Sequence, residues 1–203
     1  MYWLDLKTYS ENHQNGIRVE VKMRRVFLMM AACCVLASPA LAGGGVDLYL
    51  GYGDVVDGNW ELGIGARISL GGTHWMFDAA ATGYQTVEGA TIFDGVEADD
   101  IDVKYRAFDL GLRYLFYDGH KVRPYVGAGL SYAQVSAVNM RIDSGLGLYG
   151  LAGLRVGKPN GINFMAELIY RWAEVQGSYG LADERDITVG GLGLQVGLSF
   201  VFR

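Results

Sequence analysis

The sequence places arginines and carboxylates where they could form ion pairs with one another or line a path for ions. Three arginines share one short pattern: Gly65-Ala66-Arg67, Gly111-Leu112-Arg113 and Gly153-Leu154-Arg155. Together with the acids that could oppose them, the predicted charge network comprises Asp47, Glu61, Arg67, Asp78, Asp109, Arg113, Arg155, Glu167 and Arg171. Such side chains can build a packed polar core or a gated ion path, depending on the elements that carry them.

Side chains suited to nucleophilic or metal chemistry are few. Cys33 and Cys34 fall within a predicted export signal, and His13 precedes that signal. His74 and His120 lie in predicted turns, and neither has a neighbouring His or Cys that would complete a metal site. We therefore predict no catalytic residues, no metal site and no cofactor.

The N-terminal region is typical of a secretory signal peptide. Met23-Arg24-Arg25 provides a positive start, residues 26–36 an apolar centre, and Ala40-Leu41-Ala42 a cleavage site of small residues. The run is too short for the roughly 18 residues of a membrane-spanning helix. The predicted organisation is an upstream mis-start or leader (1–22), a signal peptide (23–42) and a single domain (43–203).

Composition bounds the class of that domain. The chain has 51% hydrophobic residues, 30 glycines and 19% charged residues, which is too apolar for disorder and too rich in glycine for a helical domain. Its formal net charge of −5 argues against nucleic-acid binding. An all-β domain is therefore predicted.

Two-residue alternation predicts eight strands separated by turn signals. Their approximate ranges are 46–53, 60–70, 75–85, 104–116, 125–134, 146–156, 162–173 and 190–202. Most exceed the usual 5 or 6 residues of a soluble strand and suit the roughly 9 to 11 residues of a tilted membrane strand.

In the central span of these strands the charged residues all fall in one phase. Glu61 and Arg67 share a face of their strand, as do Glu167 and Arg171 of theirs, while the opposite face is apolar. A single Arg or Lys at the centre of a bilayer costs about 2 to 4 kcal/mol, which explains an uncharged face that meets lipid. A soluble barrel would reverse this placement, so alternation alone leaves both possibilities open.

Aromatic residues and connection lengths favour the membrane. Aromatics cluster at strand ends on the apolar face, as two interfacial girdles would require: Trp60, Trp75, Tyr114, Phe116, Tyr132, Tyr170, Trp172 and Phe202. Short connections (71–73, 117–123 and 157–161) alternate with long ones (86–103, 136–145 and 175–186).

The last strand carries a further pattern. Gln195, Gly197, Phe200 and Phe202 resemble the C-terminal signal that delivers outer-membrane barrels to their assembly machinery. The phrases 124–130 (PYVGAGL) and 111–116 (GLRYLF) are also similar to those of the small eight-stranded outer-membrane barrels of the OmpA and OmpX type. This resemblance implies an eight-stranded antiparallel up-and-down transmembrane barrel in the outer membrane. In so narrow a barrel the charge network would form a packed polar interior.

The expected partners are outer-membrane lipid, lipopolysaccharide and, during biogenesis, the barrel assembly machinery. The protein is expected to be a monomer. The acidic segment 88–102 is a candidate recognition loop, with exposed groups Phe93, Asp94, Glu97, Asp99, Asp100 and Asp102. Lipid A-modifying barrels use a histidine at the outer rim, where none is predicted here. We predict a non-enzymatic barrel for envelope structure or recognition. The alternatives are a soluble lipocalin-like barrel with an apolar ligand, a small pore or a lipid A-modifying enzyme.

Overall fold

The computed structural model describes residues 43–56, 58–86, 103–116, 120–137, 141–178 and 185–202. The elements are strands: β1 (Gly44–Val56), β2 (Asn59–Gly71), β3 (Trp75–Tyr84), β4 (Val103–Leu115), β5 (Val122–Ala137), β6 (Arg141–Ile142), β7 (Gly145–Gly157), β8 (Gly161–Ser178), β9 (Arg185–Val189) and β10 (Leu192–Phe202). Among the described residues, no helix has the length and apolar character needed to cross a membrane. The predicted signal peptide and the 88–102 segment lie outside the described residues.

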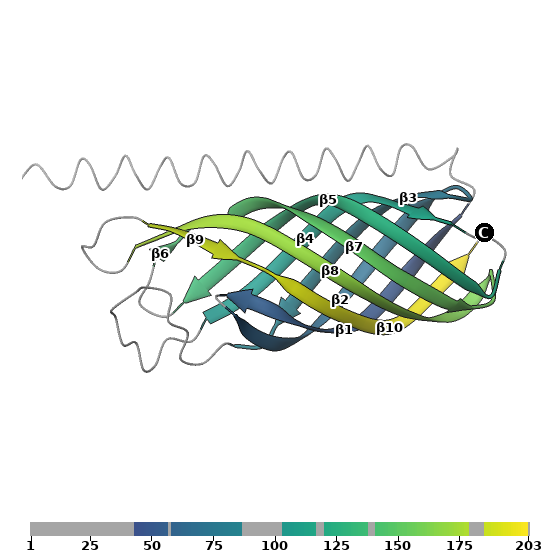
Figure 1. Cartoon of the computed structure of the whole chain (residues 1–203), viewed down its shortest axis with the longest axis horizontal. Helices are drawn as coiled ribbons and strands as arrows, with labels where there is room; N and C mark the ends of the chain where they lie inside the picture. The colour runs from purple at the N-terminus through teal and green to yellow at the C-terminus, as the bar shows by residue number, and fades with distance from the viewer. Residues whose placement is uncertain are drawn as a thin grey trace, which may run out of the picture. The chain divides into compact units, whose positions relative to one another are not determined.

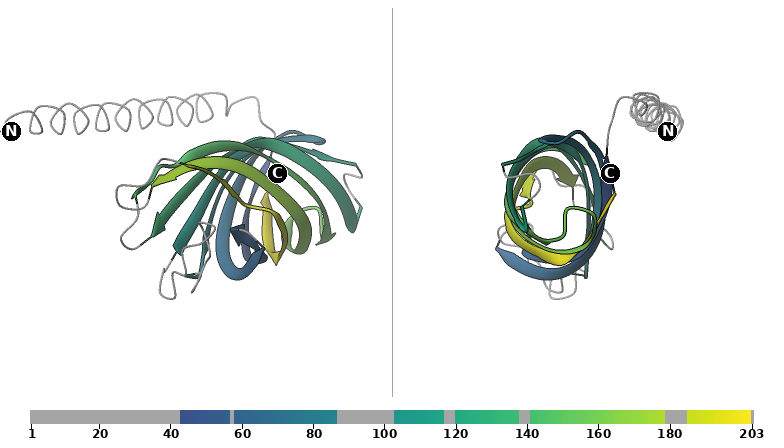
Figure 2. Two further views of the ribbon diagram at one scale, coloured as in Figure 1. Left: turned by 60° about the vertical axis from the view of Figure 1, so that its left-hand side comes forward. Right: turned by 90° about the vertical axis from the view of Figure 1, so that its right-hand side faces the viewer.

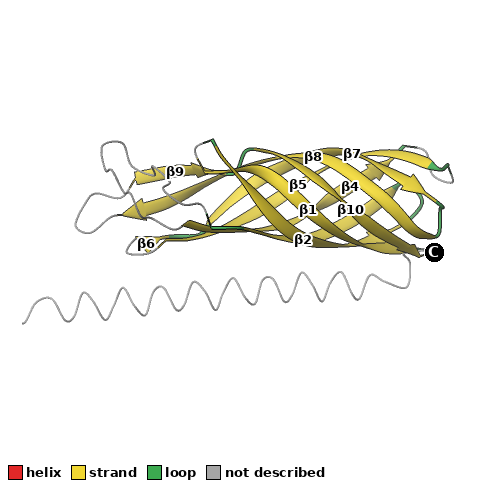
Figure 3. Ribbon diagram, turned by 90° about the horizontal axis from the view of Figure 1, so that it is seen from below, coloured by secondary structure: helices red, strands yellow, loops and turns green. Residues whose placement is uncertain are grey.

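Eight long strands close into a barrel, which confirms the predicted fold class. Neighbours along the chain pair antiparallel, and β10 returns to pair with β1, with Asp47 opposite Ser199. The end-on view in Figure 2 shows the resulting closed ring, and Figures 1 and 3 show the strands inclined to its long axis. Closure pairs both edges of the sheet, so no long edge strand is left open.

The barrel has two unlike ends. At the turn end, short connections join β2 to β3, β4 to β5 and β7 to β8, and β10 finishes there. At the loop end, the long connection 85–102 joins β3 to β4, and the segment 179–184 joins β8 to β9. β8 extends to Ser178 and pairs with β9, although sequence analysis ended this strand at 173, placed 175–186 in a connection and predicted no strand at 185–189. Gly190 and Gly191 separate β9 from β10, and the φ of +86° at Gly190 favours glycine and breaks the alternation.

Alternation sorts the side chains as the phase analysis predicted. Outward positions are apolar, and Phe164 is 71% exposed, whereas the inward Arg113 is fully buried. Outward aromatics also contact one another near both ends: Tyr52 with Trp60 (ring centroids 5.4 Å apart) at the loop end, and Trp75 with Tyr114 (4.9 Å) at the turn end. The exterior therefore has an apolar belt between two aromatic girdles.

Near the loop end the polarity reverses. Beyond Phe108 and Tyr132, the outward side chains of β4 and β5 become Arg106 and Gln134, while inward Tyr105 and Val135 are buried. On β8 the outward side chain likewise changes from Trp172 to Glu174 toward the loop end. An apolar inside with a polar outside is the pattern of a barrel in water. The strands thus continue past the apolar belt.

Candidate functional site

Asp47 of β1 is the hub of a buried charge network in the barrel lumen. Its carboxylate accepts from Arg155 Nη2 at 3.1 Å and from Arg113 Nη1 at 3.4 Å, and Arg67 Nη1 lies 3.7 Å away. Arg113 also donates to Asp78 Oδ1 at 2.9 Å. All of these side chains are at most 2% exposed, so they are shielded from water.

A second group forms around Glu167 of β8. Arg67 donates to both of its oxygens, with Nη1 2.8 Å from Oε2. Tyr125 donates its hydroxyl to Oε2 at 2.9 Å. The amide of Gln195, in the orientation that satisfies both its ends, donates to Glu167 and accepts from Arg171. Two-pronged Arg–carboxylate contact is strong and fixes both side chains geometrically.

The third group lies toward the loop end. Arg171 donates from Nε and Nη2 to Asp109 Oδ2 at 3.0 and 2.6 Å. Ser131 donates to Asp109 Oδ1 at 2.6 Å, and Tyr84 lies 3.1 Å from Arg171 Nη1. Arg171 thereby links β8 to β3 and β4.

The network joins strands that are not neighbours in the sheet. Arg67 on β2 reaches Glu167 on β8, Arg113 on β4 and Arg155 on β7 reach Asp47 on β1, and Arg171 on β8 reaches Asp109 on β4. Together with the Arg113–Asp78 pair between the neighbouring strands β4 and β3, the ion pairs of the described residues join four arginines to four carboxylates, so their charges cancel. Burial of so many charges is tolerable only when each is paired and hydrogen-bonded.

Each Gly-x-Arg pattern makes room for a tyrosine ring. A Cβ atom at Gly65 would clash with Tyr49, one at Gly111 with Tyr149, and one at Gly153 with Tyr125. Two of these rings also contact arginines: the Arg113 guanidinium carbon lies 4.8 Å from the Tyr125 ring centroid, and that of Arg67 lies 5.5 Å from the Tyr49 ring centroid. Cation–π contact of this kind is worth more when it is desolvated.

Apolar side chains pack inside the barrel beyond the network. At the loop end an inward cluster comprises Val55, Val56, Val103, Tyr105, Ala107, Ala133, Val135, Ala173, Val175 and Val189. At the turn end, Met76, Leu115 and Arg123 border a cavity of only about 10 Å³. Arg123 donates to the carbonyl of Lys158 (3.0 Å) and to Asn163 Oδ1 (2.7 Å).

The remaining predicted residues are placed as follows. Glu61 is half-buried near the loop end, and no ion pair joins it to the network in the described part of the chain. In β10, Gln195 is buried, whereas Phe200 and Phe202 face outward, 38% and 53% exposed. Their role as an assembly signal stays a prediction. The candidate loop residues from Phe93 to Asp102 lie outside the described residues.

Neither described histidine takes part in the network. His74 lies at the turn end, where its Nδ1 is 3.0 Å from the Leu115 carbonyl and its ring stacks on Tyr114. His120 is exposed at the same end. Within the described ranges, no group of three His, Cys, Asp or Glu side chains could hold a metal ion.

Sequence analysis missed several members of the interior. Arg123 is fully buried but falls in a predicted turn, because β5 begins three residues earlier than the alternation indicated. Tyr49, Tyr125 and Tyr149 were not selected because tyrosine is equally common on the outer face. Their shared inward phase with the charged residues was the available signal.

A model of the outer membrane protein beta-barrel domain matches residues 26–200, which is most of the chain. The chain belongs to that family. Its apolar outer face is therefore the surface that meets the lipid of the outer membrane, which removes the soluble lipocalin-like alternative. In a sequence comparison, no curated protein matches the chain.

Solved barrels of the same kind share the fold at low identity. OprG from Pseudomonas aeruginosa is 16% identical, with a TM-score of 0.60 over 80% of this chain and 97% of OprG. Neisserial surface protein A is 16% identical, with a TM-score of 0.57 over 79% of this chain and 96% of its own. The outer membrane protein AlkL, solved in lipid bilayers, is 15% identical, with a TM-score of 0.51 over 80% of this chain and 92% of AlkL. These similarities concern the fold alone.

Proposed function

We propose that the chain is a non-enzymatic, monomeric barrel of a Gram-negative-type outer membrane, with a closed lumen and its recognition surface at the loop end. The observation that carries the proposal is the buried, charge-balanced network that ties opposite walls of the barrel together. A narrow barrel has room for little besides its own side chains. The loop end would face outward, because the long connections of such barrels are extracellular.

The arrangement of the interior argues against a pore. A water-filled path would hydrate the charged side chains along it, whereas Arg113 and Asp47 are fully buried. The apolar cluster at the loop end adds a layer that water enters reluctantly. We infer that the charges serve to pack and rigidify the barrel.

The positions of the histidines support a non-enzymatic role. An enzyme acting on outer-leaflet lipid needs a general base at the loop end, and histidine is the most frequent choice. His74 and His120 both lie at the turn end instead.

Conductance in a planar bilayer tests the closed lumen. The full chain, refolded in detergent and inserted into a bilayer, should show no stepwise conductance above that of the lipid alone. A general porin inserted under the same conditions is the positive control. Regular steps from the wild-type barrel would refute the closed-lumen proposal.

Deletion of the outer segments tests the recognition surface. Removing residues 88–102, or the shorter 179–184, spares all described strands and should leave a barrel that still migrates differently before and after boiling. Any adhesion or serum-resistance phenotype conferred by the protein should be lost with the segment responsible. A phenotype that survives both deletions would instead support a purely structural envelope role.

A further inference from the structure

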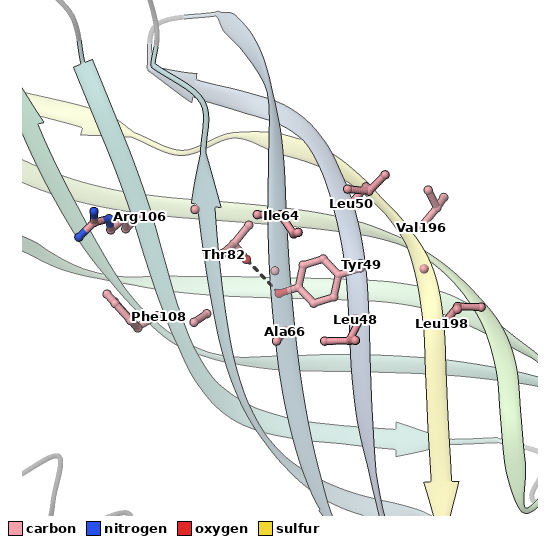
Figure 4. A pocket seen from close by; sticks show the side chains of 14 residues that line it. Leu48, Tyr49, Leu50, Ile64, Ala66, Thr82, Arg106, Phe108, Val196 and Leu198 are labelled. Atoms are coloured by element: carbon pink, nitrogen blue, oxygen red, sulfur yellow. Dashed lines mark hydrogen bonds between the residues drawn. The ribbon is translucent and has the colours of Figure 1, made fainter.

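A groove lies on the outer face of the barrel, across β10, β1, β2, β3 and β4. Its volume is about 670 Å³. Its walls are the apolar side chains of Leu48, Leu50, Ile64, Phe108, Val196 and Leu198. Figure 4 shows Phe108 and Arg106 on one side of the groove and Val196 and Leu198 on the other.

Small residues form the floor of the groove. Ala66, Ala81 and Gly83 are adjacent in the register of β2 and β3, and no atom lies within 4 Å of a Cβ built on Gly83. The groove lies within the apolar belt, so its occupant in a membrane is hydrocarbon.

A polar hollow of about 560 Å³ continues the groove toward the loop end. Gln85, Thr86, Lys104 and Arg106 are among the residues that line it. Arg106 borders both spaces, which makes it the junction between an apolar groove and a cationic hollow.

The two cations lie at the level expected for lipid headgroups. On β4, Arg106 is the next outward-facing residue after Phe108 toward the loop end. The Phe108 ring lies 6.4 Å from that of Tyr132 in the loop-end girdle. Aromatic girdles mark the boundary between hydrocarbon and headgroups. Lys104 is the next outward-facing residue after Arg106 toward the loop end. The side chains of Lys104 and Arg106 are both exposed.

At this level the exposed charges on β4 and on β8 have opposite signs. On β8, three strands away from β4, the equivalent outward residue is Glu174, and Asp186 of β9 is also exposed. Among the described residues no ion pair is found for Lys104 or Arg106. Lys104 and Arg106 thus make this face complementary to an anion.

We propose that this face binds a phosphorylated, multiply acylated lipid of the outer leaflet, of the lipid A class. Lys104 and Arg106 hold a phosphate by charge-assisted hydrogen bonds, and an acyl chain lies in the groove below it. A free phosphate would use the hollow and leave the groove to bulk lipid, whereas a phosphorylated acyl lipid fills both. The site rests on the outward orientation of the loop end proposed above.

The test compares lipid A with its dephosphorylated form on the full chain refolded in detergent. Native mass spectrometry or a titration with each lipid should show that wild-type protein prefers the phosphorylated form. Because each cation near an anionic lipid contributes about 5-fold in affinity, the K104Q/R106Q double variant should bind lipid A roughly 25-fold more weakly. Its affinity for the dephosphorylated lipid should not change.

Two further variants separate the groove from the charges. G83L fills the floor of the groove beside Arg106 and should weaken lipid A binding while leaving the weak binding of inorganic diphosphate unchanged. K121Q/K158Q removes two exposed cations at the turn end and should bind lipid A as the wild type does. Each variant is first shown to be folded by its altered migration without boiling.

Three results would overturn the site: unchanged lipid A affinity in K104Q/R106Q, an equal loss in K121Q/K158Q, or wild-type lipid A binding by G83L. Because binding is measured in detergent, the outcome does not depend on membrane orientation. Protease accessibility of the 88–102 segment on whole cells tests that orientation separately.

Discussion

Replacement of Asp47 with asparagine should destabilise the barrel more than any other single change in the lumen. The carboxylate faces Arg155, Arg113 and Arg67 at 3.1, 3.4 and 3.7 Å. At an effective dielectric constant of about 20, unit charges at such distances attract by roughly 4 to 5 kcal/mol per pair. Much of this sum is offset by desolvation of the carboxylate. Breaking one partner of a buried ion pair costs about 3 to 5 kcal/mol, and we expect D47N to fall in that range.

Arg155 provides the matched partner variant, since Asp47 is the one carboxylate with which it forms an ion pair among the described residues. R155Q alone leaves Asp47 with Arg113 and Arg67 and should cost less than D47N. The double variant restores equal numbers of opposite charges in the network. It should therefore be more stable than the sum of the two single effects predicts, by about 1 to 3 kcal/mol.

Reversible urea unfolding in detergent or lipid vesicles, followed by tryptophan fluorescence, measures these free energies. Unboiled migration on SDS gels checks that each variant closes into a barrel. A D47N free energy of unfolding within about 1 kcal/mol of wild type, or strictly additive effects of D47N and R155Q, would show that Asp47 is not the hub.

Two further changes test the outer face and the seam. L168R places a charge on the lipid face, which costs about 2 to 4 kcal/mol of insertion free energy and should lower the refolding yield. G193S on the lumen face should be tolerated. Equal yields of the two variants in a gel-shift refolding assay would contradict the assignment of faces. At the β1–β10 seam, G197A would bring a Cβ within 2.6 Å of Tyr49 Cα and should impair closure, whereas G83A meets open space and should refold like wild type. If the unfolding midpoints of G197A and G83A are the same, the close approach at the seam has no energetic consequence.

The sequence alone determined the number of long barrel strands, the phase of each of them and which of their faces is apolar. These properties are local, because successive side chains on a strand point to opposite sides. Trp60, Ile64 and Ile68 had to share one face, and Glu61 and Arg67 the other, whatever the rest of the barrel did. The lipid-facing belt followed from that phase once the family was known.

The extension of the strands past the apolar belt was harder to predict from the sequence. On β4 the inward side chains change from Asp109 to Tyr105 and Val103, while the outward ones change from Phe108 to Arg106 and Lys104. This reversal is present in the sequence, but its meaning depends on where the membrane boundary lies along each tilted strand. That boundary became visible only when the girdle aromatics of neighbouring strands were placed side by side.

The tertiary structure alone decided which charges meet. Asp47 and Arg155 are 108 positions apart and lie on strands that are not neighbours, so their contact depends on the tilt and stagger with which the sheet closes. Neither quantity is encoded in the alternation of a single strand. The same closure explains the glycines of the Gly-x-Arg patterns, since Tyr49, Tyr149 and Tyr125 reach them from other strands. Local periodicity thus fixed what faces the lumen, and closure of the ring fixed how those side chains fill it.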